Sequence, residues 1–181
     1  MVSLASIDWS SAPSEDRIRA LKVAPSRQVC AMARAVRWDA TGLDVISWIS
    51  AQQGVDLGSA LTLFLHGDPQ RFNDVPRNAV AQRDRRACSL LDALCQRINA
   101  GFYLPDPARP VSEPDRLLAY LRQQREDTRQ GLPRRWGINE TVLAPLLTDS
   151  QIIARRKGRQ AHRKTGQKPG LFGNLISPRF G

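Results

Sequence analysis

The stretch LFLHGDP places a histidine, His66, two residues before an aspartate, Asp68, and these side-chain types can carry out acid–base chemistry. A carboxylate next to an imidazole orients the ring for proton transfer. The same stretch is also typical of a helix end. A protonated histidine suits a helix C-terminus, and Gly67 followed by Pro69 stops the helix. We favour the second interpretation and predict no catalytic residue.

The three cysteines, Cys30, Cys88 and Cys95, show no arrangement that favours redox or metal chemistry. Cys88 and Cys95 follow a helical pattern that separates them by about 10 Å along the axis, too far for a disulfide. An odd, sparse cysteine count is typical of the reducing cytosol. Histidines and cysteines do not cluster as metal ligands, and no phosphate-binding glycine loop or nucleophile-elbow motif occurs. We therefore expect a cytoplasmic protein that is not an enzyme and uses neither cofactor nor metal.

The last part of the chain is strongly basic. The 181-residue sequence has 27 Lys+Arg and 17 Asp+Glu, a formal charge of +10, of which residues 151–181 carry +8 without any acid. The predicted binding residues are Arg155, Arg156, Lys157, Arg159, Arg163, Lys164, Lys168 and Arg179. A polycation of this kind attracts nucleic acid, acidic protein surfaces or anionic lipid. The sequence therefore predicts an anionic partner for this basic tail, residues 151–181.

Two aromatic residues, Phe172 and Phe180, follow the basic run and are candidates for a partner interface. Basic residues followed by apolar ones fit stacking on single-stranded nucleic acid, docking into a partner groove, or contact with a membrane surface. A solubilising, disordered tail is the alternative. The glycines and prolines of 158–181 predict a mobile segment.

Trp38 and Asp39 are the other interface candidates. A tryptophan on a surface can anchor a protein partner. More often such a tryptophan seals the gap between two helices, with Asp39 capping the helix that follows. We favour this second interpretation.

The elements that would position these residues are helical. Apolar residues at helical spacing predict helices over 15–24, 27–36, 43–53, 57–66, 79–100 and 113–130, with a shorter one after Asn139. No alternating run of strand length occurs. The sequence thus predicts an all-α protein, a compact bundle of about seven short helices. The helical domain covers residues 1–150 and the tail follows.

Capping residues predict several helix ends. Ser26, Asp56, Ser112 and Asn139 each stand where a side chain can accept from the first turn. The helix over 79–100 is expected to be the longest, and glycines at 101 and 131 to end the fifth and sixth helices. Gly58 allows another segment to pack closely. No apolar run approaches the ~18 residues that span a bilayer, and the N-terminus lacks a signal-peptide pattern.

Four short motifs extend over about residues 30–104. They are Trp38-Asp39-x-x-Gly42, Trp48-Ile49, Asp56-Leu57-Gly58-Ser59-Ala60-Leu61 with Phe64, and Arg97-Ile98-x-x-Gly101-x-Tyr103. This series resembles an uncharacterised family of small bacterial domains, the domain of unknown function number four-two-seven-four. Val55 stands where that family usually has cysteine, and Ser59 where it has threonine. The resemblance implies a helical accessory or interaction domain and no particular activity.

These observations lead to one main hypothesis and one alternative from another class. The chain is expected to be a non-enzymatic helical interaction protein whose basic tail binds nucleic acid or an acidic partner surface. The alternative is an immunity or antitoxin-type protein that masks a partner protein through its helical body. An enzyme that uses His66 would need a pocket around that residue.

Overall fold

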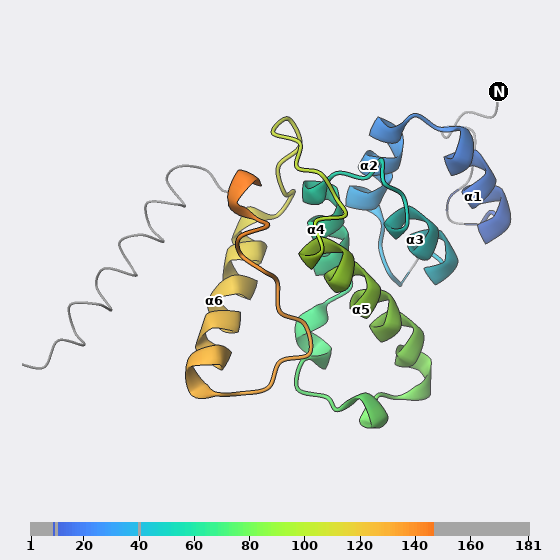
Figure 1. The fold of residues 1–181 in the computed structure, drawn as a ribbon. Coiled ribbons are helices and arrows are strands. Elements are labelled where there is room, and N and C mark those ends of the chain that lie inside the picture. The colour runs from blue at the N-terminus through green and yellow to red at the C-terminus, as the bar shows by residue number, and fades with distance from the viewer. Residues whose placement is uncertain (1–8, 10, 40, 147–181) are drawn as a thin grey trace, which may run out of the picture. The chain divides into compact units, whose positions relative to one another are not determined.

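The computed structural model describes residues 9, 11–39 and 41–146 of the chain (Figure 1). This part consists of helices, turns and loops, and contains no strand. The α-helices are α1 (Ser14–Val23), α2 (Ser26–Ala35), α3 (Leu43–Ser50), α4 (Leu57–His66), α5 (Arg85–Asn99) and α6 (Pro114–Gln130). The 3-10 turns are η2 (Pro69–Phe72), η3 (Arg77–Ala79), η4 (Gln82–Asp84) and η5 (Ala144–Leu146). The all-α prediction is confirmed.

Helix α4 is the centre of the described part. Every residue from Leu57 to Leu65 is buried, and α4 contacts α2, α5 and α6. A helix that is apolar on all sides is stable only where other elements surround it. Asp56 caps its N-terminus as predicted, because the Asp56 carboxylate accepts from the Ser59 backbone N–H at 2.8 Å. The stretch DLGSALTLFLH is therefore a capped core helix.

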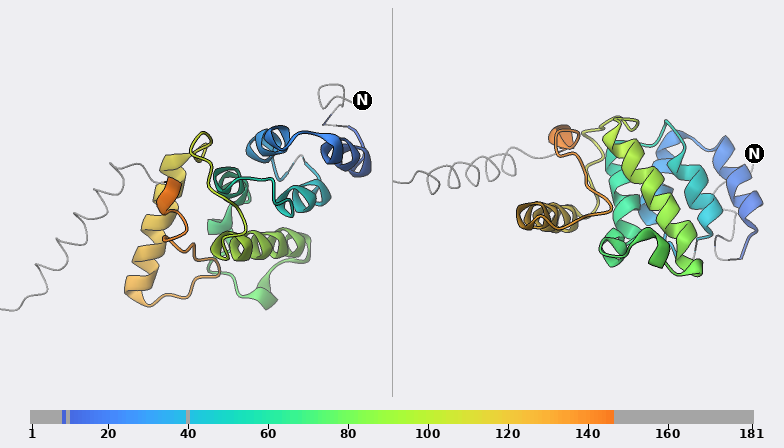
Figure 2. Two further views of the ribbon diagram at one scale, coloured as in Figure 1. Left: turned by 45° about the horizontal axis from the view of Figure 1, so that its top comes forward. Right: turned by 60° about the horizontal axis from the view of Figure 1, so that its bottom comes forward.

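Helices α1, α2 and α3 form one side of the fold, and α6 lies at the opposite end from α1 (Figure 2). Prolines set the starts of α1 and α2, because Pro13 and Pro25 are extended and directly precede the first helical residue. The prediction that Ser26 caps α2 is wrong. Ser26 is already helical and makes no capping hydrogen bond. Its hydroxyl instead lies against Gly54, where an added Cβ would come within 2.8 Å of it.

The expected long helix over 79–100 starts later than predicted. The backbone is extended at Val80 (ψ 125°) and Ala81 (ψ 143°), so this stretch forms two 3-10 turns before α5 begins at Arg85. Helix α5 has 15 residues and α6 has 17, so α6 is the longest helix described. Val80 is nevertheless buried. Its inward position explains why the apolar pattern looked continuous.

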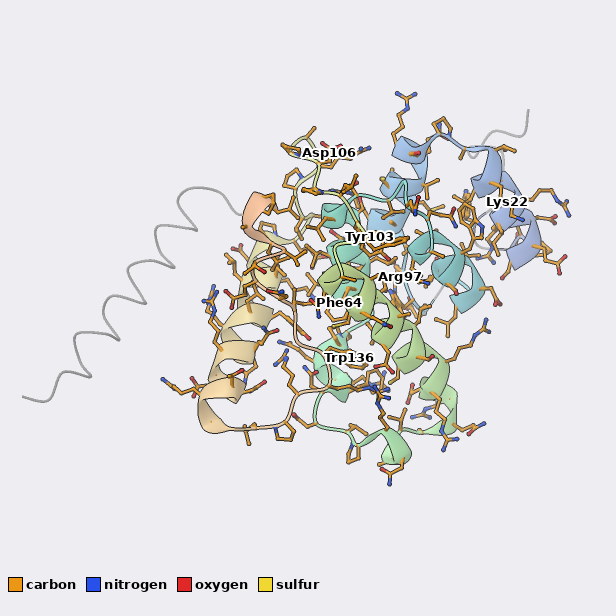
Figure 3. All side chains as sticks on the ribbon, viewed as in Figure 1. Lys22, Phe64, Arg97, Tyr103, Asp106 and Trp136 are labelled. Carbon is orange, nitrogen blue, oxygen red and sulfur yellow. The ribbon has the colours of Figure 1, made fainter. Side chains whose placement is uncertain are left out.

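The segment that follows α6 connects α6 to α5 (Figure 1). The Tyr120 hydroxyl donates to the Trp136 carbonyl at 2.6 Å, and the Trp136 indole N–H donates to Asp92 on α5 at 2.7 Å. Tyr120 also meets Phe64 of α4 edge to face, with ring centroids 5.7 Å apart. Figure 3 shows Trp136 and Phe64 lying between the α5 and α6 ribbons. Segment 132–139 therefore fills the space between the two helices.

The two predicted caps on either side of α6, Ser112 and Asn139, have different outcomes. The residue before α6 is Glu113, and no side-chain cap forms there. Ser112 instead accepts from Arg34 at 3.2 Å, and its backbone N–H donates to Thr62 at 3.2 Å. Asn139 caps only a short turn, accepting from the Thr141 N–H at 3.0 Å. Up to residue 146, where the described part ends, the expected seventh helix is limited to this turn and η5.

The predicted glycine stops at 101 and 131 are confirmed. Gly101 (φ 71°) and Gly131 (φ 69°) both adopt the left-handed conformation after their helices. Gly67 differs, because its φ is −71° and Asp68 is the left-handed residue (φ 49°). Glycine is required at 67 by packing, since an added Cβ would lie 2.8 Å from the Trp38 ring and from Leu91.

Candidate functional site

Of the predicted binding residues, only Trp38 and Asp39 lie in the described part of the chain. The eight basic residues of the tail (Arg155, Arg156, Lys157, Arg159, Arg163, Lys164, Lys168 and Arg179), together with Phe172 and Phe180, lie outside the described residues. The site is therefore built from the helical body.

Trp38 seals the junction between α2 and α4. The side chain is half-buried, its indole N–H donates to the Leu63 carbonyl at 3.1 Å, and its ring packs against Gly67. Asp39 is exposed and forms an ion pair with Arg37 at 2.8 Å. It does not cap α3, because Gly42 is the N-cap residue and no side-chain cap forms there. The capping role predicted for Asp39 is wrong.

His66 lies at the C-terminal end of α4, with both ring nitrogens in contact with acceptors. Nδ1 is 3.1 Å from the carbonyl oxygen of Val36, at the end of α2. Nε2 is 2.8 Å from Oε1 of Glu113, at the start of α6. The predicted alternative pairing with Asp68 is not formed. Sequence reasoning missed Glu113, because a residue this far along the chain gives no local signal of the contact.

The two contacts join three elements through one side chain. The carbonyl oxygen of Val36 and the carboxylate of Glu113 are both hydrogen-bond acceptors. The hydrogen bond from His66, assisted by Arg116, holds the pKa of the Glu113 carboxyl below its ordinary value. His66 therefore bridges α2, α4 and α6, and both of its ring nitrogens are occupied by contacts within the protein.

A pocket of about 530 Å³ opens next to this histidine. Its apolar wall includes Trp38, Leu43 and Phe72, and its charged rim comes from η2, η4 and the ends of α4 and α6. The charged lining residues are Arg37, Asp39, His66, Asp68, Arg71, Arg83, Asp84, Glu113 and Arg116. An enzyme that uses His66 would need a pocket around that residue, and this pocket is present. Both ring nitrogens of His66 are nevertheless occupied by protein contacts, so neither is free to act as a base.

A second polar cluster lies at the other end of α4. Asp56 is 5% exposed and is flanked by Arg34 (3.5 Å) and Arg109 (3.3 Å). Burial acts to raise the pKa of its carboxyl, but hydrogen bonds from Ser59 and Cys30 and the charge of Arg34 outweigh burial and lower it. Arg34 also donates to Ser59 Oγ (2.8 Å) and to the Arg109 carbonyl (2.7 Å). This cluster fixes the 104–112 loop against α4.

Gly58 explains why the loop can approach so closely. A Cβ at this position would lie 2.3 Å from the Arg109 carbonyl oxygen. The Leu57 N–H donates to the Leu104 carbonyl at 2.9 Å in the same region. The motif Asp56-Leu57-Gly58-Ser59 therefore has a structural role, because it caps α4 and allows the 104–112 loop to pack against this helix.

The cysteines are packing residues. All three are free and buried. Burial raises the pKa of each thiol, to about 11 for Cys95. A raised pKa keeps a thiol protonated and weakly nucleophilic. Within the described ranges, no group of three or more His, Cys, Asp or Glu side chains is arranged to hold a metal ion.

Among the described helices, none combines the length and the apolar character that crossing a bilayer requires.

Comparison of the chain with protein-family models, with curated proteins and with solved structures gives no match. The resemblance to the bacterial domain family is thus carried by its four motif steps alone.

Proposed function

We propose that this chain is a non-enzymatic binding protein whose basic tail, residues 151–181, binds a polyanion, while the helical body serves as the folded platform. The observation that carries the proposal is the distribution of acids. The tail has eight basic residues and no acid, and most acids of the body already have arginine partners. When a cationic segment without internal counter-charges binds a polyanion, it displaces the counterions condensed on the polyanion, and their release favours binding.

The ion pairs of the body support this proposal. Ten of its aspartates and glutamates lie within 3.8 Å of an arginine nitrogen, and His66 also contacts one of these, Glu113. Glu140 is likewise paired, with Arg125. Among the described residues, Glu15, Asp68, Asp74 and Asp115 form no such pair. The body therefore offers few unpaired carboxylates that could neutralise the tail, and an external anion is the better counter-charge.

The chemistry of the body supports a binding role over catalysis. His66 has acceptors on both ring nitrogens, so it cannot take a proton from a substrate without losing a contact. The buried thiols are held in the protonated form. The same proposal places the chain in the cytoplasm, where free cysteines remain reduced.

The test compares full-length protein with residues 1–150 in binding to a fluorescent single-stranded RNA and to heparin. We expect the full chain to bind both at low salt and the shortened chain to lose most of this binding. The logarithm of the RNA affinity should fall with the logarithm of salt concentration, with a slope of up to about −6 if all eight basic residues contact phosphates. Equal binding by the two forms would overturn the proposal.

Matched variants test whether binding depends on the tail or on positive charge anywhere in the protein. Replacing Arg155, Arg156, Lys157 and Arg159 by glutamine should weaken binding strongly. Replacing Arg19, Arg86 and Arg129 of the body by glutamine should have little effect, because each of these arginines is already paired with a carboxylate of the body. Affinity purification with and without nuclease then identifies the partner. Loss of partners after nuclease indicates nucleic acid, and a stoichiometric partner that survives indicates an acidic protein.

A further inference from the structure

We propose that the pocket beside His66 binds a small organic anion, with the anionic group between Arg71 and Arg83 and an apolar or aromatic body against Trp38 and Phe72. This site is independent of the basic tail. It lies within the described body, is about 530 Å³ in volume, and falls in the range of about 300–1,000 Å³ typical of small-molecule sites.

The two arginines are the main evidence. Arg71 on η2 and Arg83 on η4 flank the same carboxylate, Asp84, at 3.7 and 3.6 Å. These distances exceed those of a hydrogen bond. The side chains of Arg71 and Arg83 are 56% and 83% exposed, and neither guanidinium group donates a hydrogen bond to another described residue. Their N–H donors are therefore available to a ligand at the pocket rim.

Other arginines on the same pocket are already engaged. Arg37 donates twice to Asp39, at 2.8 and 3.2 Å, and Arg116 donates to Glu113 at 3.2 Å. The positive charge that lacks a close partner is thus concentrated at Arg71 and Arg83. Two guanidinium groups share the single Asp84 carboxylate there, so they offer more N–H donors than this carboxylate can accept. The guanidinium fork matches the oxygens of a carboxylate or a phosphate.

The apolar wall lies next to this charge. The Arg71 guanidinium lies 4.8 Å from the centroid of the Phe72 ring, an arrangement that holds the side chain over the aromatic face. Trp38 is fixed by its hydrogen bond to Leu63, so its half-buried ring is a rigid surface. A ligand with an anionic group and an apolar body would use both features.

Asp68 limits the class of ligand. It is exposed, has a left-handed backbone (φ 49°) and forms no ion pair with another described residue. A free carboxylate on the rim repels highly charged ligands and accepts from a hydroxyl or amine. The site therefore favours a ligand with one anionic group over a polyphosphate.

The test is calorimetric titration of the full-length protein with phenyl phosphate, benzoate and inorganic phosphate. The first two share a ring and differ in the anionic group, so they show which group the arginines prefer. We expect at least one of them to bind more tightly than inorganic phosphate, which lacks a ring. No binding of either ring-bearing probe would overturn the proposal, and so would equal binding of inorganic phosphate.

Three variants test whether the preferred probe binds in this pocket. Arg71→Gln and Arg83→Gln should each weaken the preferred probe by about tenfold, the loss expected for a charge-assisted hydrogen bond. Arg122→Gln, which removes an exposed arginine of α6 outside the pocket, should change affinity less than about twofold. Thermal unfolding of each variant establishes that it is folded. Equal losses in all three variants would overturn the pocket assignment, and unchanged RNA binding in Arg71→Gln would separate this site from the tail.

Discussion

Two aspartates of the body, Asp56 and Asp84, are each flanked by two arginines, and they have opposite roles. Asp56 is 5% exposed and accepts hydrogen bonds from the Ser59 amide and hydroxyl at 2.8 and 2.7 Å. Asp84 is 20% exposed, and its arginines stay beyond hydrogen-bonding distance. The first cluster is closed around its charge, and the second is open to solvent and to a pocket.

The difference shows that residue types alone do not define a site. The arginine Arg34, next to Asp56, also donates to a serine hydroxyl and a backbone carbonyl, so this cluster fixes the structure. The arginines next to Asp84 have no such second partner among the described residues. A charged group that is buried and fully paired stabilises one arrangement, whereas an exposed pair contributes little to stability. The open cluster is therefore free to bind a ligand.

The largest expected effect comes from removing the closed carboxylate. Asp56→Ala leaves Arg34 and Arg109 without their buried partner and removes the α4 cap, so we expect it to lower the free energy of unfolding by about 2–4 kcal/mol. Asp84→Ala should lower it by less than about 1 kcal/mol, because its arginines are solvated. Urea unfolding of both variants measures the contrast. Similar losses in the two variants would show that the clusters do not differ as described.

The next effect concerns the loop that covers α4. Gly58→Ala places a Cβ 2.3 Å from the Arg109 carbonyl oxygen, so the loop has to move. We expect a loss of about 1–3 kcal/mol, as is usual for overpacking. Gly137→Ala is the matched control, because the nearest atom to its added Cβ is 3.9 Å away. Thermal unfolding of both variants measures the difference. If Gly58→Ala were no less stable than Gly137→Ala, the close approach of the loop to α4 would be contradicted.

The smallest effect is a dependence on pH. The pKa of the Asp56 carboxyl lies below its ordinary value of 3.8, so its ionised form is bound more favourably in the folded state. Its stabilisation is present above that ordinary value and is lost as the pH falls through the lowered value. The free energy of unfolding should therefore decline in acid. In urea titrations between about pH 5 and pH 3, Asp56→Asn should show a shallower decline than wild type. An identical slope would mean that other carboxylates are responsible.

Sequence patterns predicted elements whose cause is local. Apolar spacing identified α1, α2, α4 and α6 close to their observed bounds. The Asp56 cap and the stops at Gly101 and Gly131 were also predictable, because each depends on one side chain and its own turn. The predictions for Ser112 and Asp39 failed because each side chain has another partner, Arg34 for Ser112 and Arg37 for Asp39. The prediction for Ser26 failed because α2 begins at Ser26 itself, directly after Pro25.

The sequence by itself determined the helical class and the uneven distribution of charge, because helix periodicity and composition can be read along the chain. Only the tertiary structure decided that His66 bonds to Glu113 and that Arg71 and Arg83 share Asp84. Those partners come from different elements, so their contact depends on how α4, α6 and the 3-10 turns pack. Burial then decided the role of each aspartate, since the same charge stabilises the fold when enclosed and can bind a ligand together with its arginines when exposed.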